Sequence, residues 1–414
     1  MAPRYPLAAV AGAIGLAFPF PADARADAPP DNAPAVPAVT TIVAPTDLMR
    51  RDLLADAQAR SAGLGAASGD FPTTKVWGFT QFRYVVNYRD DMPEGDDFTT
   101  GFQTTRTRLY FDSKITPEVS SRVRFTFSRS SGEAKLDQAY GNFSLPSEFK
   151  IRAGQFGLPL FRDEYISADR QLAVNSSPTN ILFNQGQVQG IQLSREFSDW
   201  RFWAVYSDGI RSGNTDYDNP KESDWAITGR AEWKIAGDAW SRFDDYTSFP
   251  GSTFAAMLGG AFNTEQGARW ADGFEVDQLL YLTADVGLEG DGWNAMASGV
   301  VTWVQASGGL GWRNVSGFIV QGGFFISEHT ELFARFDMSM PDSEDPVADD
   351  FRTITAGFNY YVIPASQAIK FTANVLWFLD EQATSLIKPD TAVGVLASDQ
   401  EGQWALQAQL QLVF

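Results

Sequence analysis

The sequence predicts an all-β protein, a transmembrane antiparallel β-barrel of 16 strands. Three features support this prediction: apolar and polar residues alternate with period two from Lys75 onward, the alternating segments are even in number, and short joints alternate with longer ones. The composition agrees, because a mean hydropathy of −0.20 with 14% aromatic residues is too polar for a helical membrane protein and too aromatic for a disordered one.

The N-terminal segment predicts export from the cytoplasm. Arg4 precedes an apolar run, and small residues follow up to Ala24 or Ala26, so residues 1–26 have the features of a secretory signal peptide. The run is too short to span a bilayer. Residues 27–75 are rich in alanine and proline and predict an extended periplasmic tether, with a short helix from Thr46 through about residue 60.

The barrel is expected over residues 76–414, and its last strand displays the alternation most clearly. Apolar residues such as Trp404 and Leu406 alternate with glutamines such as Gln407, so one face is apolar and the other carries amides. In a membrane barrel the apolar face meets lipid and the polar face lines a wet lumen. The expected strands are 76–88, 101–115, 121–130, 135–145, 149–157, 188–197, 200–207, 225–235, 253–263, 274–289, 292–304, 313–326, 330–340, 351–362, 367–379 and 403–414.

The joints between these strands predict the orientation, because outer-membrane barrels have short periplasmic turns and longer outer loops. Counted from residue 76, the even-numbered joints are tight except for 236–252, whose length the pattern does not explain. The odd-numbered joints are nearly all longer. Tryptophan and tyrosine residues fall mainly toward the strand ends, as in the aromatic girdles of such barrels. We therefore expect the barrel to lie in the outer membrane, in contact with its lipid.

The residue types that support catalysis or cofactor binding are scarce. The chain has no cysteine, which excludes a disulfide scaffold and a thiolate metal site. Its one histidine, His329, is expected in a turn with no serine placed to form a catalytic pair. The glycine-rich stretch Gly308-Gly309-Leu310-Gly311 precedes no helix that could bind phosphate, and the acidic loops lack the spacing of a calcium loop. The sequence thus predicts no enzyme, no metal and no cofactor.

The positive charges are expected on the lumen face of the first five strands. They share the phase of polar residues, and an outward arginine at mid-bilayer would cost roughly 2–4 kcal/mol. The chain is acidic overall, with a net charge of −19, and its acids concentrate in the expected outer loops, so we expect no nucleic-acid partner. The predicted lumen-facing cations are Arg83, Arg106, Arg108, Arg122, Arg124, Lys150 and Arg152.

Two roles for these cations follow from the sequence. In the first, they form an electropositive strip that guides small anions or polar solutes through the pore. In the second, they pair with lumen acids such as Asp112, Asp137 and Asp169 and only stiffen the wall.

Several short motifs resemble the phosphate-selective porin O and P family of outer-membrane channels, and they occur in order from about residue 76 to the end. Members of that family that select phosphate have lysine-rich constrictions, whereas this chain has eight lysines in total. The motifs are Thr104 to Phe111, Leu136 to Tyr140, Ile151 to Pro159, Ala284-Asp285, Gln321 to Phe324, Glu331 to Phe336, Thr355 to Tyr361 and Gln409 to Phe414.

The resemblance implies a 16-stranded barrel, usually a homotrimer, in which one loop folds into the lumen as a constriction. The candidate for this loop is 158–187, so that Arg162 and Arg170 could join the basic strip. The resemblance also implies that Phe414 is the assembly signal recognised by the outer-membrane barrel assembly machinery.

The function predicted on these grounds is that of an outer-membrane porin for passive diffusion of small hydrophilic solutes, with a possible preference for phosphate-type anions at an arginine-lined constriction. Two alternatives remain. One is a non-conducting barrel that anchors the envelope, with the segment at 27–62 binding a periplasmic partner. The other is an outer-membrane enzyme, for which the chain offers no assembled catalytic group.

Overall fold

The computed structural model describes residues 71–90, 97–219, 222–269, 275–306, 312–341, 349–381, 394–396 and 401–414. The expected signal peptide and the helix expected from Thr46 lie outside these residues. In the described part of the chain, no helix combines the length and the apolar composition that crossing a membrane requires.

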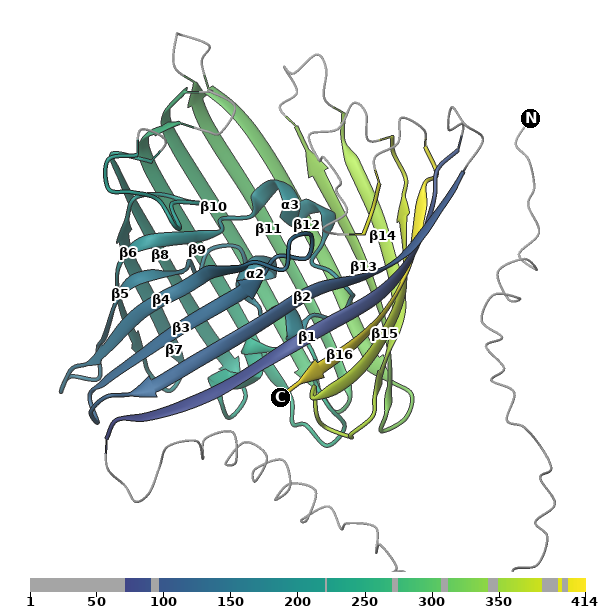
Figure 1. The fold of residues 1–414 in the computed structure, drawn as a ribbon, viewed down its shortest axis with the longest axis horizontal. Helices are drawn as coiled ribbons and strands as arrows, with labels where there is room; N and C mark the ends of the chain where they lie inside the picture. The colour runs from purple at the N-terminus through teal and green to yellow at the C-terminus, as the bar shows by residue number, and fades with distance from the viewer. Residues whose placement is uncertain are drawn as a thin grey trace, which may run out of the picture. The chain divides into compact units, whose positions relative to one another are not determined.

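Sixteen antiparallel strands form a closed barrel (Figure 1), which confirms the predicted fold class. Each strand pairs with its sequence neighbours, and β1 pairs with β16 to close the cylinder. The strands are β1 Thr73–Tyr88, β2 Phe98–Lys114, β3 Val119–Phe127, β4 Ala134–Ser144, β5 Lys150–Gly157, β6 Gln187–Glu196, β7 Trp200–Ser207, β8 Trp225–Ala236, β9 Ala255–Arg269, β10 Glu275–Gly290, β11 Trp293–Ala306, β12 Trp312–Phe325, β13 Thr330–Met340, β14 Phe351–Tyr361, β15 Ile369–Phe378 and β16 Trp404–Val413.

The strand boundaries agree with the expected ones to within three residues, except that β9 ends at Arg269 rather than at residue 263. At the closure, the backbones of Gly78 and Phe414 exchange two hydrogen bonds of 2.7 and 2.8 Å. The start of β1 and the end of β16 therefore lie at the same end of the barrel, which we call the short-turn end (Figure 1). The opposite end is the long-loop end.

The outer face of the barrel is apolar and the inner face is largely polar, as alternation in a membrane barrel requires. Phe102 and Ile191, on the outer face, are 72% and 56% exposed. Gln81, Gln407 and Gln411, on the inner face, are buried. The barrel thus has the inverted polarity expected of a protein surrounded by hydrocarbon.

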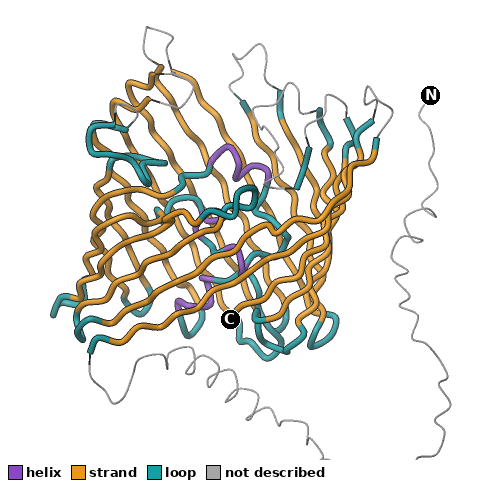
Figure 2. Tube along the Cα trace, viewed as in Figure 1, coloured by secondary structure: helices purple, strands orange, loops and turns teal. Residues whose placement is uncertain are grey.

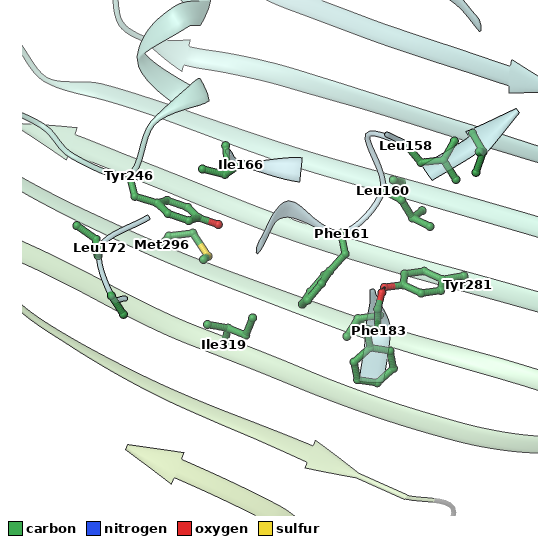
Figure 3. Close-up of a cluster of buried hydrophobic side chains, with 14 of the residues drawn as sticks. Leu158, Leu160, Phe161, Ile166, Leu172, Phe183, Tyr246, Tyr281, Met296 and Ile319 are labelled. Carbon is green, nitrogen blue, oxygen red and sulfur yellow. The ribbon is translucent and has the colours of Figure 1, made fainter. Parts of the chain in front are cut away.

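Residues 158–186, which connect β5 to β6, fold into the lumen, and we call them the inner loop (Figure 2). The inner loop contains three short helices: α2 Arg162–Tyr165, η3 Ala168–Arg170 and α3 Pro178–Phe183. Its apolar side chains pack against inward-facing apolar residues of the wall, such as Met296 and Ile319 (Figure 3). The lumen therefore contains a hydrophobic core on the side that the inner loop covers.

Residues 237–254, which connect β8 to β9, explain the long joint that the sequence pattern left unexplained. Among the described connections at the short-turn end it is the longest, and it contains the helix η4 Trp240–Asp244. Trp240, Phe243 and Tyr246 are buried. The segment, which we call the inner turn, therefore folds into the barrel instead of extending into solvent. Both strands that it connects, β8 and β9, are present as expected.

Candidate functional site

The inner loop is held against β13 and β16 by hydrogen bonds to inward-facing side chains of the wall. The Thr179 amide and hydroxyl donate to Asp337 at 3.1 and 3.0 Å, and Arg335 donates to the carbonyl of Asn175 at 3.0 Å. Gln411 donates to the carbonyl of Asp169 at 2.9 Å. Because these bonds come from three separate points along the loop, Asp169, Asn175 and Thr179, the loop has a defined position against the wall.

The other side of the inner loop is anchored by a buried ion-pair cluster on β8 and β10. The Arg162 guanidinium lies 3.9 Å from Glu232 Oε1 and 3.7 Å from Asp285 Oδ1. Arg230 contacts the same two carboxylates at 2.6 and 2.8 Å, and Arg201 of β7 bonds to Glu232 and lies 3.2 Å from a third carboxylate, that of Asp244. The three arginine side chains are at most 6% exposed. The carboxylates therefore compensate these arginines, and none of the three faces water.

The water-accessible part of the lumen lies along the wall formed by β2 to β5, which we call the open wall. Arg106, Arg108, Arg122 and Arg152 point inward from it and are only half-buried. By contrast, inward-facing groups of the remaining wall, such as Glu331, are fully buried. The accessible inward-facing side chains therefore lie on the part of the wall that faces the inner loop across the lumen.

Two carboxylates accompany the arginines of the open wall. Asp112 accepts two hydrogen bonds from Arg122, at 2.6 and 2.9 Å, and a third from Trp77 at 2.8 Å. Asp137 lies 2.7 Å from Arg124 and 3.8 Å from Arg108. The predicted pairing with Asp112 and Asp137 is thus present, but these two acids are shared by three arginines, Arg108, Arg122 and Arg124. Arg106 and Arg152 instead donate to side-chain amide oxygens at 3.4 and 3.0 Å.

Aromatic rings hold several of these guanidinium groups. The Arg152 guanidinium lies 4.2 Å from the centre of the Tyr140 ring, and Arg122 lies 5.5 Å from that of Tyr110. A ring face attracts and orients a guanidinium group without neutralising its charge. The open wall therefore keeps an excess of positive charge in fixed positions.

Glu164, on α2 of the inner loop, faces this wall. Its carboxylate accepts a hydrogen bond from Asn180 at 2.7 Å. Burial raises the pKa of Glu164, while the Asn180 bond and the charges of Arg108 and Arg106 act in the opposite direction. An acid on the loop thus lies close enough to Arg106 and Arg108 of the wall to feel their charges.

The remaining predicted residues have diverse environments. Arg83 is buried and donates to Gln103 and to Asn175 of the inner loop, at 2.6 and 3.3 Å. Lys150 is exposed at the start of β5, and Arg170 donates to the carbonyl of Asp244 at 3.4 Å. Asp169 lies on the inner loop and bonds to Ser167. Phe414 is 61% exposed.

Sequence reasoning did not identify the aromatic supports Trp77, Tyr110 and Tyr140, although they share the inward phase of the arginines and could have been found by the same alternation. It also did not identify Glu164, which no alternation reports because it lies in a loop. His329 lies in the turn where it was expected, with Nδ1 2.7 Å from the carbonyl oxygen of Tyr361. In the described residues, no group of three or more histidine, aspartate or glutamate side chains could hold a metal ion.

Solved structures with a similar fold include outer-membrane proteins, porins and channels. OmpT of Vibrio cholerae, an outer-membrane protein, has a TM-score of 0.56 at 11% identity and matches 84% of this chain and 100% of its own. The anion-selective porin from Comamonas acidovorans has a TM-score of 0.56 at 13% identity, over 83% and 100% of the two chains.

The outer-membrane channel DcaP of Acinetobacter baumannii has a TM-score of 0.55 at 12% identity, over 84% of this chain and 99% of its own. At these identities the likeness concerns the fold alone. No model of a known protein family matches the sequence, and a comparison with curated proteins finds no match.

Proposed function

We propose that the protein is a porin of the outer membrane through which small hydrophilic solutes diffuse passively, with a preference for anions. The observation that carries this proposal is the difference in charge balance between the two sides of the lumen. The accessible wall has more arginines than carboxylates, whereas the arginines that carboxylates compensate are buried on the other side. Low-dielectric walls focus the field of such charges into the aqueous path, which raises the local concentration of anions.

The chemistry of the open wall favours oxyanions. Arginine presents a planar fork of donors that matches carboxylate and phosphate groups, and the ring contacts at Tyr110 and Tyr140 orient that fork in advance. Together with the resemblance to phosphate-selective porins, this supports a phosphate-type anion as the preferred solute. The protein's solute path would then contain Arg106, Arg108, Arg122 and Arg152, with Lys150 at its periplasmic mouth, while the predicted Arg124 is buried and paired with Asp137.

The same proposal extends to the cellular context. Residues 1–26 direct export, residues 27–75 form the periplasmic tether, and the short-turn end faces the periplasm. The barrel assembly machinery reads the exposed Phe414, and three copies of the chain form a homotrimer. A structure of OmpT from Vibrio cholerae described as a trimer form, with a TM-score of 0.56 and 11% identity, supports the last point.

One observation favours the alternative of a non-conducting barrel. The inner loop and the inner turn fill the lumen along most of the wall, and the buried polar residues there leave no solute path. If the passage beside Arg106 is too narrow for hydrated ions, the barrel serves envelope architecture instead.

Planar-bilayer recording on the refolded full chain tests the proposal. We expect discrete conductance steps, and a reversal potential under a potassium chloride gradient that has the sign of chloride preference. Competition by phosphate at constant chloride should reduce the current. Cation preference would overturn the anion assignment, and the absence of steps from verified folded barrels would favour the non-conducting alternative.

A further inference from the structure

The inner loop and the inner turn enter the barrel from opposite ends and meet inside it. The Phe243 carbonyl of the turn accepts a hydrogen bond from Arg162 of the loop at 2.5 Å. The amide of Tyr246 donates to the carbonyl of Arg170 at 3.4 Å. The Tyr246 ring joins the same hydrophobic cluster as Ile166 and other apolar residues of the loop (Figure 3).

The inner turn is itself fixed to the wall. Arg242 pairs with Glu289 of β10 at 3.2 Å, and the Ser248 hydroxyl donates to the carbonyl of Gly290 at 2.7 Å. The hydroxyls of Thr247 and Tyr361 are 3.0 Å apart. The loop therefore rests on a segment that is bonded to β10 and β14, so its position on this side is determined by the barrel.

We infer that the inner turn supports the inner loop from the short-turn end, and that Arg162 is a positioning residue which fixes the distance between the loop and the open wall. This inference rests on the proposed channel function and adds to it a determinant of pore width. It also accounts for the length of the 237–254 connection, because two strands can be joined by a far shorter turn, as at 291–292.

Arg162 suits this role because it joins three parts of the molecule. Besides the two wall carboxylates and the Phe243 carbonyl, its guanidinium contacts Tyr165 Oη at 2.9 Å and Met257 Sδ at 3.2 Å. The buried guanidinium has few alternative positions, because moving away from the carboxylates would place an uncompensated charge in a site without water. Arg162 thereby fixes the positions of the inner loop, the inner turn and the wall relative to one another.

The inference assigns to Arg162 a role different from that of the arginines of the open wall. Arg162 is 2% exposed, so its charge does not meet the solute directly. Loss of Arg162 should therefore change the width and steadiness of the pore, whereas loss of an open-wall arginine should change its ion preference.

Two matched pairs of variants test the inference by single-channel recording on the refolded full chain. Tyr246→Ala removes the ring that contacts the loop, and Tyr246→Phe removes only a hydroxyl that has no hydrogen-bond partner among the described residues. Arg162→Gln removes the central guanidinium. Its control is Arg195→Gln, at a half-buried outward-facing arginine paired with the exposed Glu148.

We expect Tyr246→Ala and Arg162→Gln to raise the single-channel conductance by about twofold and to increase current noise, because a displaced loop widens the passage. The anion-to-cation permeability ratio should change little, and both controls should match the unaltered protein. Heat-dependent mobility on a denaturing gel establishes that each barrel is folded. If Arg162→Gln does not fold, the two Tyr246 variants decide the matter.

Folded Tyr246→Ala barrels with unchanged conductance and noise would overturn the inference. A reduced permeability ratio at unchanged conductance in Arg162→Gln would also do so, because it would place Arg162 among the residues that meet the solute. A failure of the underlying channel proposal is distinguishable, since the unaltered protein would then give no conductance steps at all.

Discussion

The two sides of the barrel interior use the same residue types in opposite ways. On the open wall the Arg122–Asp112 pair is 33% and 29% exposed, and its arginine lies over aromatic rings. On the packed side the Arg230 pairs with Glu232 and Asp285 are fully buried beneath the inner loop. The comparison teaches that an inward-facing arginine can line a water path or fasten a loop, and that the segment packed against it decides which.

The largest expected effect is on stability. Glu232→Ala leaves Arg201 and Arg230 buried without their shared carboxylate, and we expect it to lower the free energy of unfolding by about 3–5 kcal/mol. Asp112→Ala, its counterpart on the open wall, should cost ~1 kcal/mol or less because water solvates Arg122. Urea unfolding of refolded barrels, followed by tryptophan fluorescence, measures both. Similar losses for the two variants would contradict the distinction between the packed and open sides.

The second effect concerns ion preference. Replacing Arg106 and Arg108 together by glutamine removes two charges beside the passage, so the anion-to-cation permeability ratio should fall severalfold while the barrel remains folded. Arg352→Gln, which alters an arginine paired with Asp380 at 2.5 Å next to the long-loop end, is the control and should leave the ratio nearly unchanged. Reversal potentials under a salt gradient give the ratio. Equal effects of the two changes would show that overall charge, not the open wall, sets the preference.

The smallest expected effect is a dependence on pH. Because burial raises the pKa of Glu164, this carboxyl group becomes neutral at a higher pH than an ordinary glutamate as the solution is acidified. Its loss of charge leaves Arg106 and Arg108 less compensated, so anion preference should increase modestly with falling pH. Glu164→Gln should have the increased preference at neutral pH and lose this part of the pH response. An unchanged response in that variant would assign it to another group.

Most of the fold followed from alternation, because in a membrane barrel the period of two reports directly which residues meet lipid. For example, the alternation alone assigns Trp404 to the outer face of β16 and Gln407 to its inner face. Alternation does not report what fills the interior. Met296 and Ile319 have the inward phase of polar residues and yet contact the apolar core of the inner loop. The length of the 237–254 connection was visible in the sequence, but its inward path depends on partners in β10 and β14.

The candidate site was predicted for its strand residues and not for its loop residues. Arg108 and Arg122 have a fixed phase on neighbouring strands, so their common face could be derived. Arg162 has no such phase, and its partners Glu232 and Asp285 are distant in the sequence. The sequence therefore places Arg162 with the basic residues of the solute path, whereas the structure surrounds it with carboxylates.

The seam between β1 and β16 has a consequence for the timing of biogenesis. The inner loop bonds to both sides of this seam, through Gln81 to the carbonyl of Ala168 at 3.1 Å and through Gln411 to that of Asp169. The loop cannot complete its docking until the final strand has arrived. A chain arrested before that moment presents two unpaired strand edges and an unfilled apolar interior, a state prone to aggregation.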